Sequence, residues 1–346
     1  MKKFLFVAYL FAFKFGSAQI GGMGTYQFLQ VPTNARINAL GGNAISTPDA
    51  DINLVSINPS LLNKKNHQQI GANYINYFSD IKAGELNFAF HSDTLKTTFA
   101  AGIQYMNYGN FIKTSPDGQV LGTFNAGEYN YHVSAARTYQ QFSYGATLKF
   151  INSNLEAYNS FGVAADIAAN WRSEDELMLV TAVIGNIGTQ ISTYTQNNYE
   201  NIPYNVQLGF SKKFAHNPFR IGIIAHNLQS PGKLLYQISN RQFTSLETGL
   251  PIEEDFNFLQ KAMSHVIINT ELLLGKSIQV RFGYNALRNR ELSLNNIRGM
   301  NGFSWGIGLK LNRFHFAYGY GGFIPGRNTN SFSVVTRIQD FKRATN

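Results

Sequence analysis

The sequence predicts an all-β protein: a transmembrane antiparallel β-barrel of about fourteen strands, with an N-terminal hatch or plug segment before the first strand. Three observations predict this fold. Strand-like segments alternate apolar and polar residues with period two. Short connections alternate with long ones along much of the chain. A Gly-rich segment with a different residue pattern precedes the first of these strands.

The period-two pattern is clearest in Phe142–Ile151, where one face carries only apolar residues and the other carries Ser, Gly, Thr and Lys. Ser277–Asn285 and Gly302–Leu311 follow the same rule. Successive side chains of a strand point to opposite faces, so each segment has one apolar and one polar face. Strands are expected to begin near Gln68, Ile81, Thr97, Phe124, Phe142, Asn159, Leu177, Tyr204, Phe219, His265, Ser277, Gly302, Phe314 and Phe332.

The polar faces carry ionisable residues at mid-strand, namely Glu85, Glu128, Asp166, Arg281 and Lys310. A central Arg or Lys facing lipid would cost about 2–4 kcal/mol. The polar faces are therefore expected to line the interior and the apolar faces to meet lipid. The alternative is a soluble β-sandwich or a large periplasmic barrel, with the apolar face inward. Aromatic residues near the strand ends favour the membrane barrel, because they are typical of interfacial girdles.

Connection lengths also favour a membrane barrel, which has short periplasmic turns and longer extracellular loops. Tight connections are expected at Ser92–Asp93, Gln140–Gln141, Gly275–Lys276 and Asn312–Arg313. Long connections are expected at Gly109–Thr123, Asn186–Pro203, Gln229–Ser264 and Leu287–Asn301. A soluble sandwich has no reason to sort its loops in this way.

The first residues are typical of an export signal. Lys2 and Lys3 precede an apolar stretch that is too short to span a bilayer, and Gly16-Ser17-Ala18 places the cleavage before Gln19. Removing Lys2, Lys3 and Lys14 lowers the formal charge from +9 to +6. The chain has no Cys, which excludes thiolate metal sites, a nucleophilic cysteine and disulfides. No later stretch is long and apolar enough for a membrane helix.

Residues 19–66 are expected to form the hatch, after a signal peptide of residues 1–18 and before a barrel of residues 67–346. This region contains Gly21-Gly22-Met23-Gly24, a helix-compatible stretch from Ala35 to Leu40, then Gly41-Gly42 and Asn58-Pro59. These signals are too structured for a plain linker. About fourteen strands enclose a lumen that wall side chains alone cannot fill.

Motifs for catalysis and metal binding are weak in this chain. Gly302-Phe303-Ser304-Trp305-Gly306 matches the nucleophile elbow of hydrolases, but the Ser lies inside an alternating strand without an acid between it and His315. Asp49-x-Asp51-x-Asn53 begins like a calcium loop but lacks the required Gly and Glu. We therefore expect no catalytic residues, no cofactor and no metal.

The histidines are scattered, and His132, His226, His265 and His315 fall on polar strand faces or at strand ends. A hydrogen-bonding role in the lumen is the simpler interpretation for them than metal ligation. The composition has no clustered basic patch of the kind that binds nucleic acid.

The longest predicted loop, Gln229–Ser264, is the candidate surface for a protein partner. It combines apolar residues with several acidic ones, and such patches often mark interaction surfaces. The candidate contact residues are Phe243, Leu246, Leu250, Phe256, Phe258 and Leu259. The alternative is a loop that folds inward onto itself or onto the hatch.

The N-terminal segment resembles the hatch of FadL-like outer-membrane proteins. The resemblance rests on residues 35–44, which contain Gly41-Gly42, and on Asn58-Pro59-Ser60-Leu61-Leu62; Arg36 belongs to the same motif. Within that group, residues 21–29 with Pro32 are similar to the PorQ family of the type IX secretion system of Bacteroidota, a family related to PorV. Asn201-Ile202-Pro203-Tyr204 and Ala225-His226-Asn227-Leu228 add to the similarity.

This resemblance implies a non-enzymatic outer-membrane protein of the attachment complex. Such a protein holds a PorZ-like surface protein through its extracellular loops, beside PorU-like and PorV-like proteins, in a complex that joins cargo to anionic lipopolysaccharide. Lipids and lipopolysaccharide of the outer membrane are further expected partners. The alternative function is a FadL-like transporter of hydrophobic small molecules. A transporter would need an apolar cavity beside the hatch and a lateral opening at a kinked strand.

Overall fold

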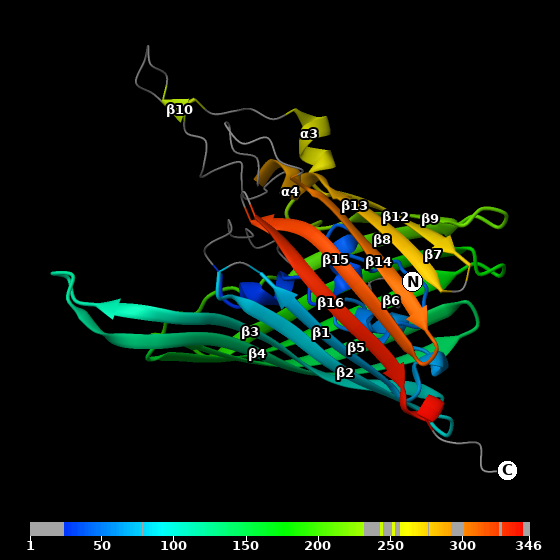
Figure 1. Ribbon diagram of the computed structural model, residues 1–346, viewed down its shortest axis with the longest axis horizontal. Helices are drawn as coiled ribbons and strands as arrows, with labels where there is room; N and C mark the ends of the chain where they lie inside the picture. Colours follow the sequence, from blue (N-terminus) through cyan, green and yellow to red (C-terminus); the bar gives the residue numbers. More distant parts are fainter. Residues whose placement is uncertain are drawn as a thin grey trace, which may run out of the picture.

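Fourteen strands form a closed antiparallel barrel (Figure 1). The computed structural model describes residues 24–77, 79–231, 243–244, 251–252, 257–275, 277–291, 301–324 and 327–341. The first and last wall strands pair with each other and close the barrel, with Gln69 opposite Arg337. The wall strands are β1 (Gln69–Asn76), β2 (Lys82–Ser92), β3 (Thr97–Thr114), β4 (Val120–Tyr139), β5 (Phe142–Leu155), β6 (Tyr158–Arg172), β7 (Met178–Ser192), β8 (Asn205–Lys213), β9 (Phe219–Ala225), β12 (Val266–Leu274), β13 (Ile278–Asn285), β14 (Phe303–Leu311), β15 (Phe314–Ile324) and β16 (Arg327–Arg337).

The predicted strand count is confirmed, and most strands begin within one residue of the expected position. Two predicted starts are late. β4 begins at Val120 rather than near Phe124, and β16 begins at Arg327 rather than near Phe332. The early residues of β4, Val120-Leu121-Gly122-Thr123, do not alternate, and those of β16, from Arg327 to Ser331, are all polar. The period-two signal is therefore absent there while the backbone pairing continues. The predicted loop Gly109–Thr123 is wrong for the same reason, because pairing between β3 and β4 continues to Thr114 opposite Val120.

The two ends of the barrel differ. We call the end with both barrel termini the turn end, where the connections are short, such as Gln140–Gln141 between β4 and β5. The opposite end is the loop end, from which the β3–β4 hairpin projects (Figure 1). Contrary to the prediction from the sequence, not every connection at the loop end is long. Only Glu156 and Ala157 connect β5 to β6, and the long connection predicted after Asn186 is shortened because β7 continues to Ser192.

Outward side chains are apolar and inward ones are polar, as the sequence predicts. In β5 the outward residues Phe142, Tyr144 and Leu148 are each more than half exposed. The inward residues Glu85, Glu128, Asp166 and Arg281 are buried, whereas Lys310 faces a cavity at the turn end. The alternative with an inward apolar face is therefore wrong.

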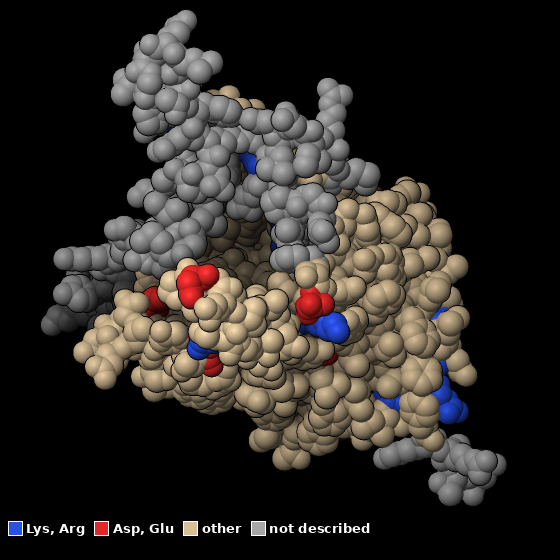
Figure 2. All heavy atoms as spheres, turned by 60° about the vertical axis from the view of Figure 1, so that its left-hand side comes forward, with Lys and Arg blue, Asp and Glu red and all other residues tan. Residues whose placement is uncertain are grey.

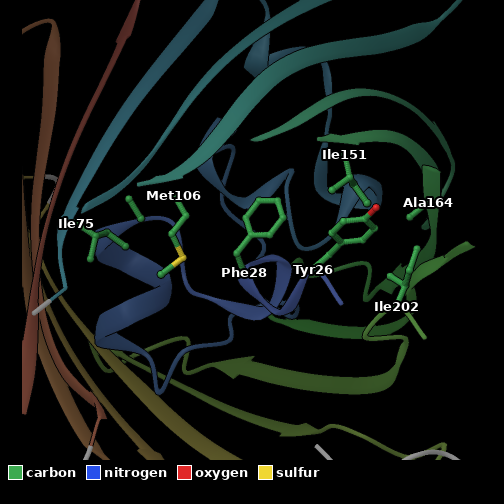
Figure 3. Packing of buried hydrophobic residues seen from close by; sticks show 8 residues of the cluster. Tyr26, Phe28, Ile75, Met106, Ile151, Ala164 and Ile202 are labelled. Carbon is green, nitrogen blue, oxygen red and sulfur yellow. The ribbon is translucent and has the colours of Figure 1, made fainter. Parts of the chain in front are cut away.

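Residues 24–68 are called the inner segment below; most of them are buried within the barrel, whereas Lys64 and Lys65 near the end of the segment are exposed. Its short helices are η1 (Gln27–Gln30), α2 (Ala35–Ala39), η2 (Ile52–Leu54), η3 (Pro59–Leu61) and η4 (Lys64–Asn66). Tyr26 and Phe28 pack against Met106 of β3 and Ile151 of β5 in a buried apolar cluster (Figure 3). Other parts of the inner segment pack on β7, β9 and β12.

Short strands and helices lie at the two ends of the barrel. They are β10 (Phe243–Thr244), β11 (Pro251–Ile252), α3 (Phe258–Met263), α4 (Ala286–Glu291) and η6 (Ile338–Phe341). Within the described residues, no helix is both long and apolar enough to cross a membrane.

Candidate functional site

Inward glycines of the wall let the inner segment approach the strands backbone to backbone. A Cβ at Gly283 of β13 would collide with the backbone of Leu40 and Gly41, and one at Gly319 of β15 would collide with the backbone of Ala35. A Cβ at Gly145 of β5 would lie 2.7 Å from the carbonyl carbon of Pro59. Glycine in a strand often marks such a close backbone approach. Glycine at these positions therefore leaves room for the backbone of the inner segment against the wall.

Hydrogen bonds join the inner segment to strands around the barrel. The Asn38 amide donates to the Ser331 hydroxyl of β16 over 2.6 Å, and Gln104 of β3 donates to the carbonyl of Phe28 over 3.1 Å. Ser304 of the predicted elbow motif donates to the carbonyl of Ala39 and accepts from the N–H of Gly41. The Ser304 hydroxyl thus binds the inner segment. Ser304 lies within a regular strand and not at the strand-to-helix turn that a nucleophile elbow requires.

The predicted hatch-motif residues have clear structural roles. Gly41 and Gly42 have φ angles of 87° and 85°, a left-handed conformation that suits Gly. Asn58 caps η3 by accepting from the N–H of Ser60, and it donates to the carbonyl of Ile45 over 2.7 Å. Pro59 follows at the first position of η3, where it needs no N–H partner.

Arg36, the remaining motif residue, lies in a group of charges that we call the ion cluster, which is buried except for Asp49, whose side chain is 32% exposed. It consists of Arg36, Asp49 and Asp51 of the inner segment and Arg220, Glu271 and Arg281 of the wall. Arg36 Nη2 lies 2.8 Å from Oε1 of Glu271, and Arg281 Nε lies 3.0 Å from the same oxygen. Three guanidinium groups meet three carboxylates, so the charges balance. Balance matters because an unpaired buried charge is costly.

The carboxylates of the apparent calcium loop are used in this cluster. Asp49 pairs with Arg36 and, over 2.8 Å, with Arg220, and Asp51 accepts from Arg36 Nη1 over 3.3 Å. Burial raises the pKa of Asp49, but Arg36 and Arg220 outweigh burial and hold it well below its usual value. Among the described residues, no group of three or more His, Asp or Glu side chains could hold a metal ion.

A cavity of about 710 Å³ lies between the ion cluster and the turn end. Arg36, Asp49 and Arg220 form its inner limit. Its other lining residues include the cations Lys213, Lys310, Arg313 and Arg337. This turn-end cavity is therefore polar and bears an excess of positive charge. The ion cluster separates it from the interior of the barrel.

A second cavity, of about 300 Å³, lies on the other side of the inner segment, and we call it the loop-end cavity. The lining is mixed, and its apolar residues are called the apolar wall below. The apolar side chains are Leu29, Val31, Pro32, Ile37, Ile57, Ile267 and Leu287. The polar ones include Lys149, Asp166, Asn186, Gln207, His226 and Asn285. Figure 2, which brings the loop end forward, shows a hollow in the middle of this face.

The strand pairing is interrupted beside this cavity. Between β6 and β7 the register shifts, so that Asp166 faces both Gly185 and Asn186, a β-bulge. Asn186 has a φ of 58° and donates its N–H to Oδ1 of Asp166 over 2.7 Å. Lys149 of β5 bridges Oδ2 of Asp166 and Oδ1 of Asn186, each over 2.7 Å. The bulge therefore brings a polar, charged group to the cavity wall.

The predicted partner-contact residues are only partly described. Phe258 and Leu259 lie in α3 and are 87% and 68% exposed, which suits a contact surface but does not test it. Phe243 lies in β10, which pairs with β11, but its side chain lies outside the described residues. Leu246, Leu250 and Phe256 lie outside the described residues, as does the predicted cleavage before Gln19.

Sequence reasoning missed several residues of these sites. Arg220 and Glu271 were not recognised, although both lie on inward faces of their strands and an inward mid-strand charge signals a lumenal partner. The β6–β7 bulge was also missed. Its signal was the loss of the apolar alternation at Gly185-Asn186. The buried, unpaired Nε2 of His226 could not be predicted from sequence, although His226 was placed at a strand end.

Comparison with solved structures finds barrels of similar fold. No protein-family model matches the sequence, and no curated protein matches it. The toluene transporter TodX of P. putida aligns over 90% of this chain and 99% of its own, with a TM-score of 0.53 and 11% identity. The toluene transporter TbuX of Ralstonia pickettii aligns over 89% and 99%, with a TM-score of 0.49 and 11% identity. A FadL homologue of Pseudomonas aeruginosa covers 88% and 98%, with a TM-score of 0.45 and 10% identity.

The chain has the fold of the TodX barrel. At this level of identity the likeness concerns the fold alone, which agrees with the fold class predicted from the sequence. The comparisons do not support the finer resemblance to the PorQ family or a role in type IX secretion, which stays a prediction. TbuX and TodX are each described as a toluene transporter.

Proposed function

We propose that this protein is an outer-membrane transporter of small hydrophobic molecules. The loop end would face outward and the turn end the periplasm, as is usual for barrels with short periplasmic turns. The outward faces of the strands suit lipid, because they carry exposed Phe, Tyr, Leu and Ile side chains. This function is the alternative, not the leading, hypothesis of the sequence.

One observation supports transport above the others: the loop-end cavity lies between the inner segment and the β6–β7 bulge. Ligand sites are concave clefts that start near 300 Å³, which is the size found here, and the lining of this one combines apolar and polar side chains. The apolar wall, with Ile57 and Leu287, would hold the body of a small hydrocarbon.

The bulge supplies the kinked strand that a lateral route requires. Below the cavity, the ion cluster and the glycine contacts close the direct path to the turn end. A molecule that enters from the loop end therefore meets a blocked lumen and a weakened strand pair at the same depth. We propose that small hydrophobic molecules leave the cavity near this bulge.

Uptake by cells tests this proposal. Cells that produce the protein should accumulate radiolabelled toluene through an intact lipopolysaccharide layer faster than cells without it. Ile57→Trp fills the cavity and should abolish the gain. Leu148→Trp, on the lipid-facing side of β5, is the matched control and should leave uptake unchanged. Equal uptake with and without the protein would contradict the proposal.

A second candidate is an anchor for a surface protein, because of the β3–β4 hairpin. β2 pairs with β3 only as far as Asn107, and β5 pairs with β4 only as far as Ala126. The hairpin beyond these points exposes Ile112, Val120 and Leu121. Such an apolar ribbon with free edges suits a protein partner. In the finer form of this proposal, the partner is a PorZ-like protein of a type IX attachment complex.

The anchor is tested by removing the candidate surfaces and recovering partners from detergent-solubilised outer membrane. Deleting residues 229–264 should leave a heat-modifiable barrel but release the surface partner. Shortening the β3–β4 hairpin by residues 110–125 is the parallel deletion. If both deletants keep the same partners as the unaltered protein, the anchor proposal is wrong. Recovery of bound lipid without any protein partner would favour transport.

A further inference from the structure

His226 gives the loop-end cavity a polar group that the protein itself does not use. His226 directly follows β9 and is 6% exposed. Its backbone is held in place, because its N–H donates to the carbonyl of His265 over 2.9 Å and its own carbonyl lies 2.8 Å from Nδ1 of His265. His226 is one of the residues that line the cavity, and its Nε2 is buried. Its position is therefore fixed by the barrel and not by a flexible loop.

Most other polar side chains around this cavity have partners inside the protein. Lys149, Asp166 and Asn186 bind one another, and Gln207 accepts from Asn43. Asn285 donates to the carbonyl of Gly41. Among the described residues that line the cavity, Nε2 of His226 is the buried side-chain nitrogen or oxygen without a hydrogen-bond partner. A buried polar atom of this kind costs about 1–3 kcal/mol unless a ligand or water satisfies it.

The imidazole is uncharged at neutral pH. Burial, with smaller contributions from His265 and Arg288, lowers the pKa of His226 to about 3. A neutral imidazole carries a proton on one nitrogen, so Nε2 is either a donor or an acceptor. A hydroxyl group can serve both states, because it donates and accepts. Lys149 and Asp166 pair with each other, and Arg288, which also lines the cavity, donates to the carbonyl of Gly41.

We propose that the loop-end cavity selects small aromatic or aliphatic molecules that carry one neutral hydroxyl group, and that Nε2 of His226 binds this hydroxyl. The apolar wall holds the hydrocarbon body, and His226 sets its orientation. This inference rests on the proposed transport function and adds the substrate class. A cavity of about 300 Å³ suits a molecule of one or two rings, since a 150 Å³ apolar cavity already holds benzene.

The preference should be measurable as a ratio of affinities. A site with a buried hydrogen-bonding group discriminates against an analogue that lacks the matching group. One neutral hydrogen bond corresponds to roughly a tenfold difference in Kd. The probes are p-cresol and toluene, which differ by one hydroxyl, together with the carboxylated analogue p-toluate. A phenol with a pKa near 10 stays un-ionised at pH 7.

The experiment titrates each probe into the purified full-length protein in detergent, by calorimetry against a detergent blank. The unaltered protein should bind p-cresol about tenfold more tightly than toluene, and more tightly than p-toluate. His226→Phe should bring the ratio of p-cresol to toluene affinity close to one, and His226→Gln should keep part of the preference. Ile57→Ala, on the apolar wall, should weaken both probes alike and leave the ratio unchanged. Heat-modifiable migration and the melting temperature check that each variant folds.

The outcomes separate this inference from the proposed function. Equal binding of toluene and p-cresol, or a ratio that survives His226→Phe, would overturn the role of His226 while transport of hydrophobic molecules still stands. Tighter binding of p-toluate than of p-cresol would show that a charge and not a neutral hydroxyl is recognised, and would also overturn it. Binding of none of the three probes would contradict the proposed function itself.

Discussion

Arg36 Nη2 of the inner segment lies 2.8 Å from Glu271 Oε1 of β12, and both side chains are buried. The two residues are separated by 235 positions in the sequence. Their contact ties the contents of the barrel to its wall at the level that separates the two cavities. Glu271 also accepts from Arg220 and Arg281, so one carboxylate holds three guanidinium groups. It is the central residue of the ion cluster.

Replacing Glu271 by Gln should therefore release the inner segment. The substitution leaves Arg36, Arg220 and Arg281 with too little negative charge, and breaking a buried pair costs about 3–5 kcal/mol. We expect a lower melting temperature and a higher ion conductance in planar bilayers. Lys64→Gln is the control, because its pair with Asp93 is exposed, and it should change neither quantity. Unaltered conductance in the Glu271 variant would show that the ion cluster does not hold the inner segment in place.

The lowered pKa of Asp49 predicts that the ion cluster stabilises the protein less at acidic pH. Burial raises its pKa, but Arg36 and Arg220 outweigh burial, so the pKa in the folded protein lies below the unfolded value of about 3.9. A lowered pKa stabilises the fold at every pH above the unfolded value, and this stabilisation is lost as pH falls toward the folded value. The melting temperature of the unaltered protein should exceed that of Asp49→Asn by a constant amount between pH 5 and pH 7, as follows from these pKa values.

Below about pH 4 the difference between the two proteins should shrink, because Asp49 itself becomes protonated. Thermal melts monitored by circular dichroism over this range measure it. A difference that is as large at pH 3 as at pH 7 would mean that the charge of Asp49 does not contribute.

The glycine contacts predict that a single methyl group disturbs the inner segment. Gly283→Ala places a Cβ against the backbone of Leu40 and Gly41, and overpacking typically costs about 1–3 kcal/mol. Gly127→Ala is the matched control, since the nearest atom to its Cβ would be the Met106 carbonyl oxygen at 3.5 Å. We expect a lower melting temperature for the first variant alone. Equal melting temperatures would show that the wall tolerates bulk at Gly283.

The β6–β7 bulge predicts a gate that a disulfide can lock. The chain has no Cys, so a disulfide can form only between the two introduced cysteines. Ala165→Cys with Ile187→Cys joins two registered partners at the bulge, and Ala169→Cys with Ala182→Cys joins two partners in regular pairing. Oxidation should slow toluene uptake through the first variant, reductant should restore it, and the second should be unaffected. Identical uptake by the oxidised and reduced forms would exclude passage at the bulge.

Much of the wall could be predicted from sequence, because period two is a local signal. The strands near Phe142 and Phe314 begin at the predicted residues. The outer ends of β4 and β16 could not be predicted, since their pairing continues through residues that do not alternate between apolar and polar. Inward charges such as Arg281 and Asp166 were recognised as lumenal because lipid excludes them.

Partner choice inside the lumen could not be predicted. Glu271 and Arg36 meet only after the barrel closes, and nothing local in either strand or helix indicates the other. The same holds for Asn58, whose cap on η3 was predictable from Asn-Pro, while its bond to the Ile45 carbonyl was not. The loop-end cavity is formed by residues from Leu29 to Arg288, so its size depends on tertiary packing.

The most direct test of a hydrophobic site beside the bulge is a crystal structure of the protein soaked with iodotoluene, using anomalous scattering to locate iodine. The account predicts an iodine peak in the loop-end cavity, between Ile57 and the β6–β7 bulge, that disappears in Ile57→Trp. Iodine peaks confined to the outer, lipid-facing surface, with the cavity free of iodine in the unaltered protein, would contradict it.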